Sequence, residues 1–145
     1  MRWGHKYEDR AIKKYSFIYD TPVTRCGFIL HPTIEMAGAS PDGLIGDDGL
    51  VEVKCPQPGT HMFFLRTGKI KPEYILQMQF QMACTERKWY DFVSYDPLLK
   101  KKLIGFRVKM QRVQSDDEQI ELINKAVETF LEEIEQETRS FTQAA

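Results

Sequence analysis

The stretch ASPDGLIGDDGLVEVKCP, residues 39–56, holds four acidic residues and one lysine in a segment that is typical of two strands joined by a turn. Glu52 and Lys54 are two residues apart, so on a strand their side chains point to the same face. Val51 and Val53 then point to the other face, toward the core. A strand that only fills a core does not need a carboxylate and an ammonium group side by side, so this segment bears on both fold and function.

The turn decides which acidic side chains meet. Asp42 precedes the turn and Glu52 follows it. In an antiparallel hairpin, directly opposite residues share a face, with Cα atoms roughly 5 Å apart. Asp42 lies opposite Glu52 only if the loop has an odd length, of three or five residues, centred on Asp47; a two-residue Asp47-Asp48 turn would place the carboxylates on opposite faces. The glycines on either side of this pair favour the odd loop, in which Asp47 and Asp48 only shape the turn.

The expected pair of carboxylates suggests a metal site. Two carboxylates at this separation repel each other, and either protonation of one or binding of a hard cation relieves the repulsion. Mg²⁺, with Mn²⁺ as a substitute, prefers such oxygen ligands. A cation held by Asp42 and Glu52 would polarise a phosphoryl oxygen and lower the pKa of a water molecule, while Lys54 would place a positive charge near the developing charge. The alternative is an exposed Glu-x-Lys pair, which is a common and weak surface interaction.

The bulk composition is that of one soluble domain. The chain has 145 residues, with 42% hydrophobic and 28% charged residues, and no apolar run that would span a membrane. Its three cysteines form no C-x-x-C pair and its N-terminus lacks a signal-peptide pattern, which indicates reduced thiols in a cytoplasmic setting. The three histidines show no zinc-type spacing. A net charge of -1 neither indicates nor excludes a nucleic-acid partner, since a local basic groove is sufficient.

Hydrophobic periodicity predicts the other elements. Helices are expected over residues 5–16, 59–67, 72–86 and about 115–138, and strands over residues 23–30, 35–45, 49–55, 88–95 and 103–112. In the first helix Glu8 shares a face with apolar residues, and Ser115 followed by Glu118 is a capping-box pattern for the last. This order indicates an α/β fold in which helices flank a mixed central sheet.

Several motifs together resemble the bacteriophage lambda exonuclease family, also called the YqaJ viral recombinase family, a branch of the PD-(D/E)XK nucleases with a restriction-endonuclease-like core. The motifs are S-P-D-G-L from Ser40, L-V-E-V-K-C-P from Leu50, the helix Gly4 to Glu8, L-Q-M-Q from Leu76 and Y-D-P from Tyr95. The resemblance covers roughly residues 3–110, within a single nuclease domain over residues 1–145.

The resemblance implies roles for individual residues. Asp42 and Glu52 would hold the metal, with the backbone carbonyl of Val53 as a further ligand, and Glu8 would complete the acidic cluster. Lys54 would position or activate the attacking water.

Other residues would contact the substrate or support the site. Gln77 would lie beside the site, orienting Lys54 or the scissile phosphate, and Ser40 would contact the DNA backbone. The basic residues Arg66 and Lys69 would line a DNA path, although plain surface is the alternative for both. Gln79 and Gln81 are expected at the helix surface or the edge of the core.

The activity implied is a Mg²⁺-dependent 5′-to-3′ exonuclease that acts on double-stranded DNA ends in phage recombination, in the host cytoplasm, and leaves a single strand for an annealing protein. An endonuclease on the same scaffold, or a non-catalytic DNA-binding or partner-docking module, stays open. Family members usually carry a further N-terminal region before the Glu8 helix. Its lack here makes 5′-end recognition and the family's homotrimer doubtful expectations.

Overall fold

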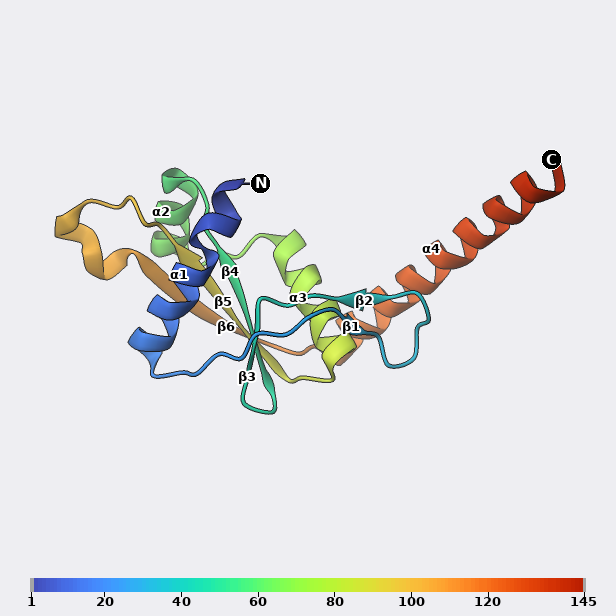
Figure 1. Ribbon diagram of the computed structural model, residues 1–145, viewed down its shortest axis with the longest axis horizontal. Helices are drawn as coiled ribbons and strands as arrows, with labels where there is room; N and C mark the ends of the chain where they lie inside the picture. The colour runs from blue at the N-terminus through green and yellow to red at the C-terminus, as the bar shows by residue number, and fades with distance from the viewer. Residues whose placement is uncertain (1, 145) are drawn as a thin grey trace.

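The elements follow one another in the order helix, strands, two helices, strands, helix. The computed structural model describes residues 2–144, and the side chains of residues 7–142. The elements are α1 (Arg2–Tyr19), β1 (Ile29–Leu30), β2 (Gly38–Ala39), β3 (Gly43–Ile45), β4 (Gly49–Lys54), α2 (Pro58–Thr67), α3 (Pro72–Thr85), β5 (Trp89–Tyr95), the 3-10 segment η1 (Lys101–Phe106), β6 (Val108–Gln114) and α4 (Asp117–Ala144). Figure 1 shows their arrangement.

A four-stranded mixed sheet in the order β3-β4-β5-β6 forms the centre. β4 and β5 are parallel, whereas β3 with β4 and β5 with β6 are antiparallel. The parallel pair requires a long crossover, which α2 and α3 supply. The predicted mixed sheet flanked by helices is therefore confirmed.

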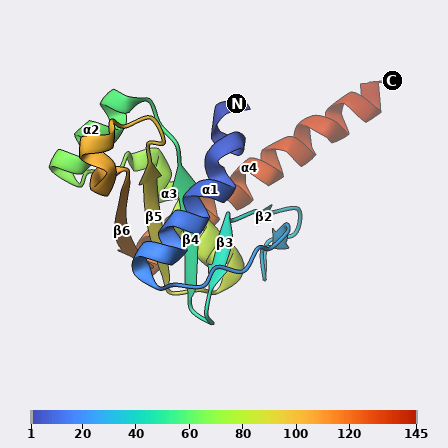
Figure 2. The ribbon, with the colours of Figure 1, turned by 60° about the vertical axis from the view of Figure 1, so that its left-hand side comes forward.

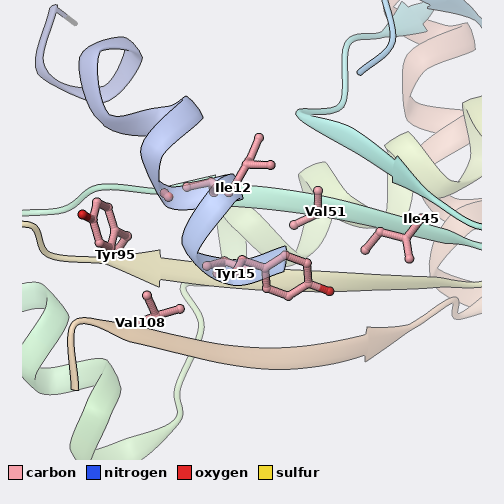
Figure 3. Close-up of a cluster of buried hydrophobic side chains, with 9 residues drawn as sticks. Ile12, Tyr15, Ile45, Val51, Tyr95 and Val108 are labelled. Atoms are coloured by element: carbon pink, nitrogen blue, oxygen red, sulfur yellow. The ribbon is translucent and has the colours of Figure 1, made fainter. Parts of the chain in front are cut away.

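The two faces of the sheet carry separate apolar clusters, since side chains alternate along each strand. Val51 and Val93 pack under α1 with Ala11, Ile12 and Tyr15 of that helix. Figures 2 and 3 show α1 crossing this face, with Ile12 and Tyr15 directed toward Val51. On the other face, rings and side chains of α2, α3 and the strands pack together: Leu50, Phe64, Met78, Met82, Tyr90 and Phe92.

A buried ion pair anchors α1 to the sheet. Asp91 of β5 is fully buried, and it accepts a 2.5 Å hydrogen bond from the Tyr15 hydroxyl. Arg112 of β6 binds the same carboxylate through two nitrogens, at 2.7 and 2.9 Å, and its guanidinium lies 3.7 Å from the Trp89 ring centroid. Because Tyr15 is held in this way, the position of Glu8 two turns earlier on α1 is tied to the sheet.

Three predicted strands were wrong in extent. Residues 23–30 are irregular apart from β1 and one bridge between Thr24 and Leu44. Residues 35–45 divide into β2 and β3, because Pro41 between them has no N–H for a sheet. The strand predicted over residues 103–112 begins only at Val108 and runs to Gln114, and η1 takes the preceding residues, where the buried His61 ring bonds the Phe106 carbonyl at 2.8 Å.

The predicted helices all form, with shifted ends. α1 starts earlier and ends later than expected, and α4 runs to Ala144. The N-terminal cap of α4 is Asp116, whose carboxylate accepts the Gln119 N–H at 3.0 Å, and not Ser115 as predicted. Beyond its first turns α4 projects from the rest of the molecule, with Phe130 59% exposed (Figure 1). Within residues 2–144, no helix is long and apolar enough to cross a membrane.

Candidate active site

The β3–β4 hairpin brings Asp42 opposite Glu52. Gly43 pairs with Val51 and Ile45 with Gly49, so the loop consists of Gly46, Asp47 and Asp48. Continued by one residue, this register sets Asp42 across from Glu52, and the predicted odd loop centred on Asp47 is confirmed.

Local interactions hold this loop in shape. Gly46 has a φ of 51°, a left-handed conformation that favours glycine. Gly49 lies against the Trp89 ring and leaves no room for a side chain. The Arg87 guanidinium donates to the carbonyls of Ile45, Gly46 and Gly49, at 3.3, 2.8 and 2.7 Å. The register that aligns the two carboxylates is therefore clamped from the β5 side of the turn.

Asp42 is held by the backbone of the neighbouring strand. Its Oδ2 accepts the Val53 N–H at 2.7 Å. Burial, followed by the negative charge of Glu52, raises the pKa of Asp42 to about 7, although the Val53 hydrogen bond acts in the opposite direction. The two carboxylates therefore lie close enough to oppose each other's ionisation.

Glu52 is almost completely buried, with 3% exposure, in a nest of donors. Lys54 Nζ forms an ion pair with Glu52 Oε1, and Gln77 Nε2 donates to the same oxygen at 3.2 Å. The Tyr90 hydroxyl lies 3.4 Å from Glu52 Oε2 and also donates to Gln81 Oε1. The structure thus brings together Glu52, Lys54 and Gln77 of the predicted set, and adds Tyr90 and Gln81 beneath them.

Lys54 is held between a carboxylate and an aromatic ring. Its Nζ lies 5.0 Å from the Tyr74 ring centroid, in cation–π range. Burial tends to lower the pKa of Lys54, but the charge of Glu52, the hydrogen bond to it and the charge of Asp42 outweigh burial and raise that pKa. Lys54 is therefore an ammonium group at neutral pH, able to donate hydrogen bonds and to balance negative charge.

Glu8 lies at the edge of the site and binds Arg25. Arg25 Nη1 donates to Glu8 Oε1 and to the Asp42 backbone carbonyl, both at 2.7 Å, and Arg25 Nη2 pairs with Asp9. The charge of Glu8 also contributes to raising the pKa of Asp42, after burial and Glu52. Across the described part of the chain, no three His, Cys, Asp or Glu side chains converge closely enough to hold a metal ion, so the acidic cluster does not include Glu8 as a third close member.

The predicted DNA-contacting residues lie at different distances from this centre. Ser40 is exposed, two residues before Asp42. Lys69 lines a pocket together with Lys54, whereas Arg66 lines a separate pocket beside η1. The structure therefore brings Lys69, but not Arg66, toward the site.

The sequence analysis missed Arg25, Tyr74, Tyr90 and Gln81 and misplaced Gln79. Gln81 follows Gln77 by four residues and so shares its helix face, a spacing that would have revealed it. Gln79 and Gln81 are both buried, contrary to the surface or core-edge position that was predicted. Gln79 binds the Gln114 carbonyl and the Asp116 N–H, both at 2.9 Å, and so joins α3 to the start of α4.

A mixed sheet between helices, with an aspartate on one strand and Glu-x-Lys on its neighbour, is the architecture of the PD-(D/E)XK nucleases, and the chain has this fold. Within that class, the chain belongs to the family of YqaJ-like viral recombinase domains, whose model matches residues 1–88. The predicted family membership is confirmed.

Solved structures support the same placement. The chain is 46% identical to an alkaline exonuclease, LHK-Exo from Laribacter hongkongensis, with a TM-score of 0.92 over 100% of this chain and 75% of that chain. The same values hold for LHK-Exo in complex with dAMP. A phage-related exonuclease from Haemophilus somnus 129PT is 21% identical, with a TM-score of 0.66 over 86% of this chain and 65% of that chain, a likeness of fold alone. No match was found among proteins with curated descriptions.

Proposed function

We propose that this protein is a divalent-metal-dependent DNA exonuclease that hydrolyses phosphodiester bonds from the ends of double-stranded DNA. The observation that carries the proposal is the juxtaposition of Asp42, Glu52 and Lys54 by one clamped hairpin. The 46% identity to LHK-Exo supports the exonuclease activity, and the dAMP complex of that relative supports a deoxynucleotide product.

The donor set fits a hard cation such as Mg²⁺, or Mn²⁺ in its place. Burial and Glu52 raise the pKa of Asp42 to about 7, and a cation between the two carboxylates would remove this opposition. Asp42 and Glu52 would hold the ion, with the Val53 carbonyl as a further oxygen and Glu8 as the nearest additional carboxylate. When bound, the ion would polarise a phosphoryl oxygen and lower the pKa of a water molecule.

The chain's own residues perform the remaining tasks. Lys54, fixed by Glu52 and the Tyr74 ring, would donate a hydrogen bond to the water or to a phosphate oxygen and stabilise the charge that develops there. Gln77 would hold Glu52 and, through it, Lys54. Ser40, Lys69 and Arg66 would contact the DNA backbone.

The finer proposal is digestion in the 5′-to-3′ direction during phage recombination, in the host cytoplasm. The remaining single strand would pass to an annealing protein. A homotrimer, as in the family, would hold the enzyme on DNA.

Linear and covalently closed circular duplex DNA test the proposal, each with Mg²⁺ and with a chelator. An exonuclease digests only the linear DNA and only with Mg²⁺. Digestion of the circle would show an endonuclease on the same scaffold. Binding of DNA with no turnover under any condition would show a non-catalytic module.

A further inference from the structure

A pocket opens beside Lys54, at the carboxyl ends of the parallel strands β4 and β5. It lies between α2 and the start of α3, and encloses about 450 Å³, open solvent at its mouth included. This volume is in the range of small-molecule sites, and the carboxyl ends of parallel strands are where α/β sheets commonly bind ligands.

The pocket combines aromatic walls with a cationic rim. Phe63, Phe64, Tyr74 and Phe92 supply rings, and Lys54, Lys69 and Lys71 supply ammonium groups. Phe64 and Tyr74 both pack on Phe92, with ring centroids 5.3 and 5.7 Å away, so these three rings form a firm floor. Phe63 is 47% exposed and therefore has ring surface free to contact a ligand.

These features favour a ligand with a flat apolar body and an anionic group. A free phosphate would satisfy the lysines but leave the aromatic walls unused. A nucleotide satisfies both, because every base has a face that stacks on aromatic rings and its phosphate pairs with ammonium groups.

The geometry points to a nucleoside-binding subsite: we infer that this pocket receives one nucleoside of the cleaved strand, with its base against Phe63 and its phosphate toward Lys54, Lys69 and Lys71. The inference rests on the proposed nuclease function, because Lys54 belongs to both the pocket and the candidate active site. It adds that the enzyme holds a base next to the scissile phosphate, whereas a backbone-only enzyme would be indifferent to the base.

Binding of DNA with single abasic positions tests this subsite. Duplexes carry one abasic site at each of the first few nucleotides of either strand, and Ca²⁺ replaces Mg²⁺, with gel electrophoresis to confirm that the DNA stays intact. The proteins compared are wild type, Phe63→Ala, Phe63→Tyr and Met62→Ala. Met62 is the matched control, since it is 40% exposed on the same helix and lines a different pocket.

The expected result is a coupling between one base and one ring. An abasic site at one position weakens wild-type binding roughly tenfold, and Phe63→Ala weakens binding of intact DNA by a similar factor. In Phe63→Ala that abasic site has no further effect. Phe63→Tyr keeps the wild-type pattern, and so does Met62→Ala.

Two results would overturn the inference in distinguishable ways. If the effects of Phe63→Ala and of every abasic site simply multiply, while Mg²⁺ supports hydrolysis of intact DNA, the pocket holds no base and the nuclease function stands. If the wild-type protein binds no DNA, the pocket proposal and the proposed function fail together.

Discussion

Asp42 accepts the backbone N–H of Val53 at 2.7 Å, and this single bond ties the first carboxylate of the candidate site to the strand that carries the second. The bond holds Asp42 beside Glu52 before any cation binds. The arrangement has an electrostatic cost, which appears as the raised pKa of Asp42. That cost makes the site measurable without any assay of activity.

Asp42→Asn should stabilise the metal-free protein above neutral pH. The pKa of Asp42 is raised from 3.8 to about 7, so the folded state binds this proton more tightly than the unfolded state. Stability from this group is fully present below pH 3.8, falls as the pH rises toward 7, and stays low above it. At pH 8 with a chelator we expect the Asn variant to have a Tm higher by at least about 3 °C, with a difference that vanishes near pH 4.

Thermal unfolding monitored by circular dichroism measures this difference, and Asp47→Asn, at an exposed turn position, is the control. Mg²⁺ should raise the Tm of the wild type at pH 8 and have little effect on Asp42→Asn. Equal Tm values for the two proteins at pH 8 would show that Asp42 is not under strain.

Glu52→Gln and Lys54→Ala should each abolish most hydrolysis of linear DNA. Glu52 is the most buried of the candidate ligands, and Lys54 is the ammonium group paired with it. Losing such a charge-stabilising group lowers turnover by at least about 100-fold. Initial rates on linear duplex DNA with Mg²⁺ test the loss, with Lys88→Ala, which removes an exposed lysine paired with Asp48, as the control. Near-normal hydrolysis by Glu52→Ala would refute the proposed site.

Arg112→Met should destabilise the fold, because it leaves the fully buried Asp91 carboxylate without its cation. Loss of one partner of a buried pair costs about 3 kcal/mol in the free energy of unfolding. Tyr15→Phe, which removes a single donor to Asp91, should cost about 1 kcal/mol. Urea unfolding measures both changes. A loss below about 1 kcal/mol for Arg112→Met would mean that Asp91 takes up a proton and needs no cation.

Lys69→Gln should lower the salt dependence of DNA binding. Lys69 lines the pocket that contains Lys54, so it lies where the DNA backbone would pass. Removing one phosphate contact reduces the slope of log affinity against log salt concentration by about one. Fluorescence anisotropy over a salt series measures the slope. Lys13→Gln, an exposed lysine on α1, makes the same charge change outside the pocket and should leave the slope unaltered.

Local spacing alone determined the centre of the site. The period of two along a strand puts Glu52 and Lys54 on one face, and the parity of the hairpin loop puts Asp42 opposite Glu52; both follow from backbone geometry over a few residues. Prolines near the starts of α2 and α3 marked those helices for the same reason. The S-P-D-G and E-x-K-C-P motifs pointed to the family.

Only the tertiary structure decided which distant side chains complete the site. Arg25 meets Glu8 and Asp42, and Tyr90 meets Glu52, across 17 and 38 residues of sequence. The irregular course of residues 20–37 and the conversion of residues 101–106 into η1 likewise depend on partners elsewhere, such as His61 for the Phe106 carbonyl. Periodicity reports only the neighbours within an element. Contacts between elements arise from the packing of whole helices on the sheet, which no local pattern specifies.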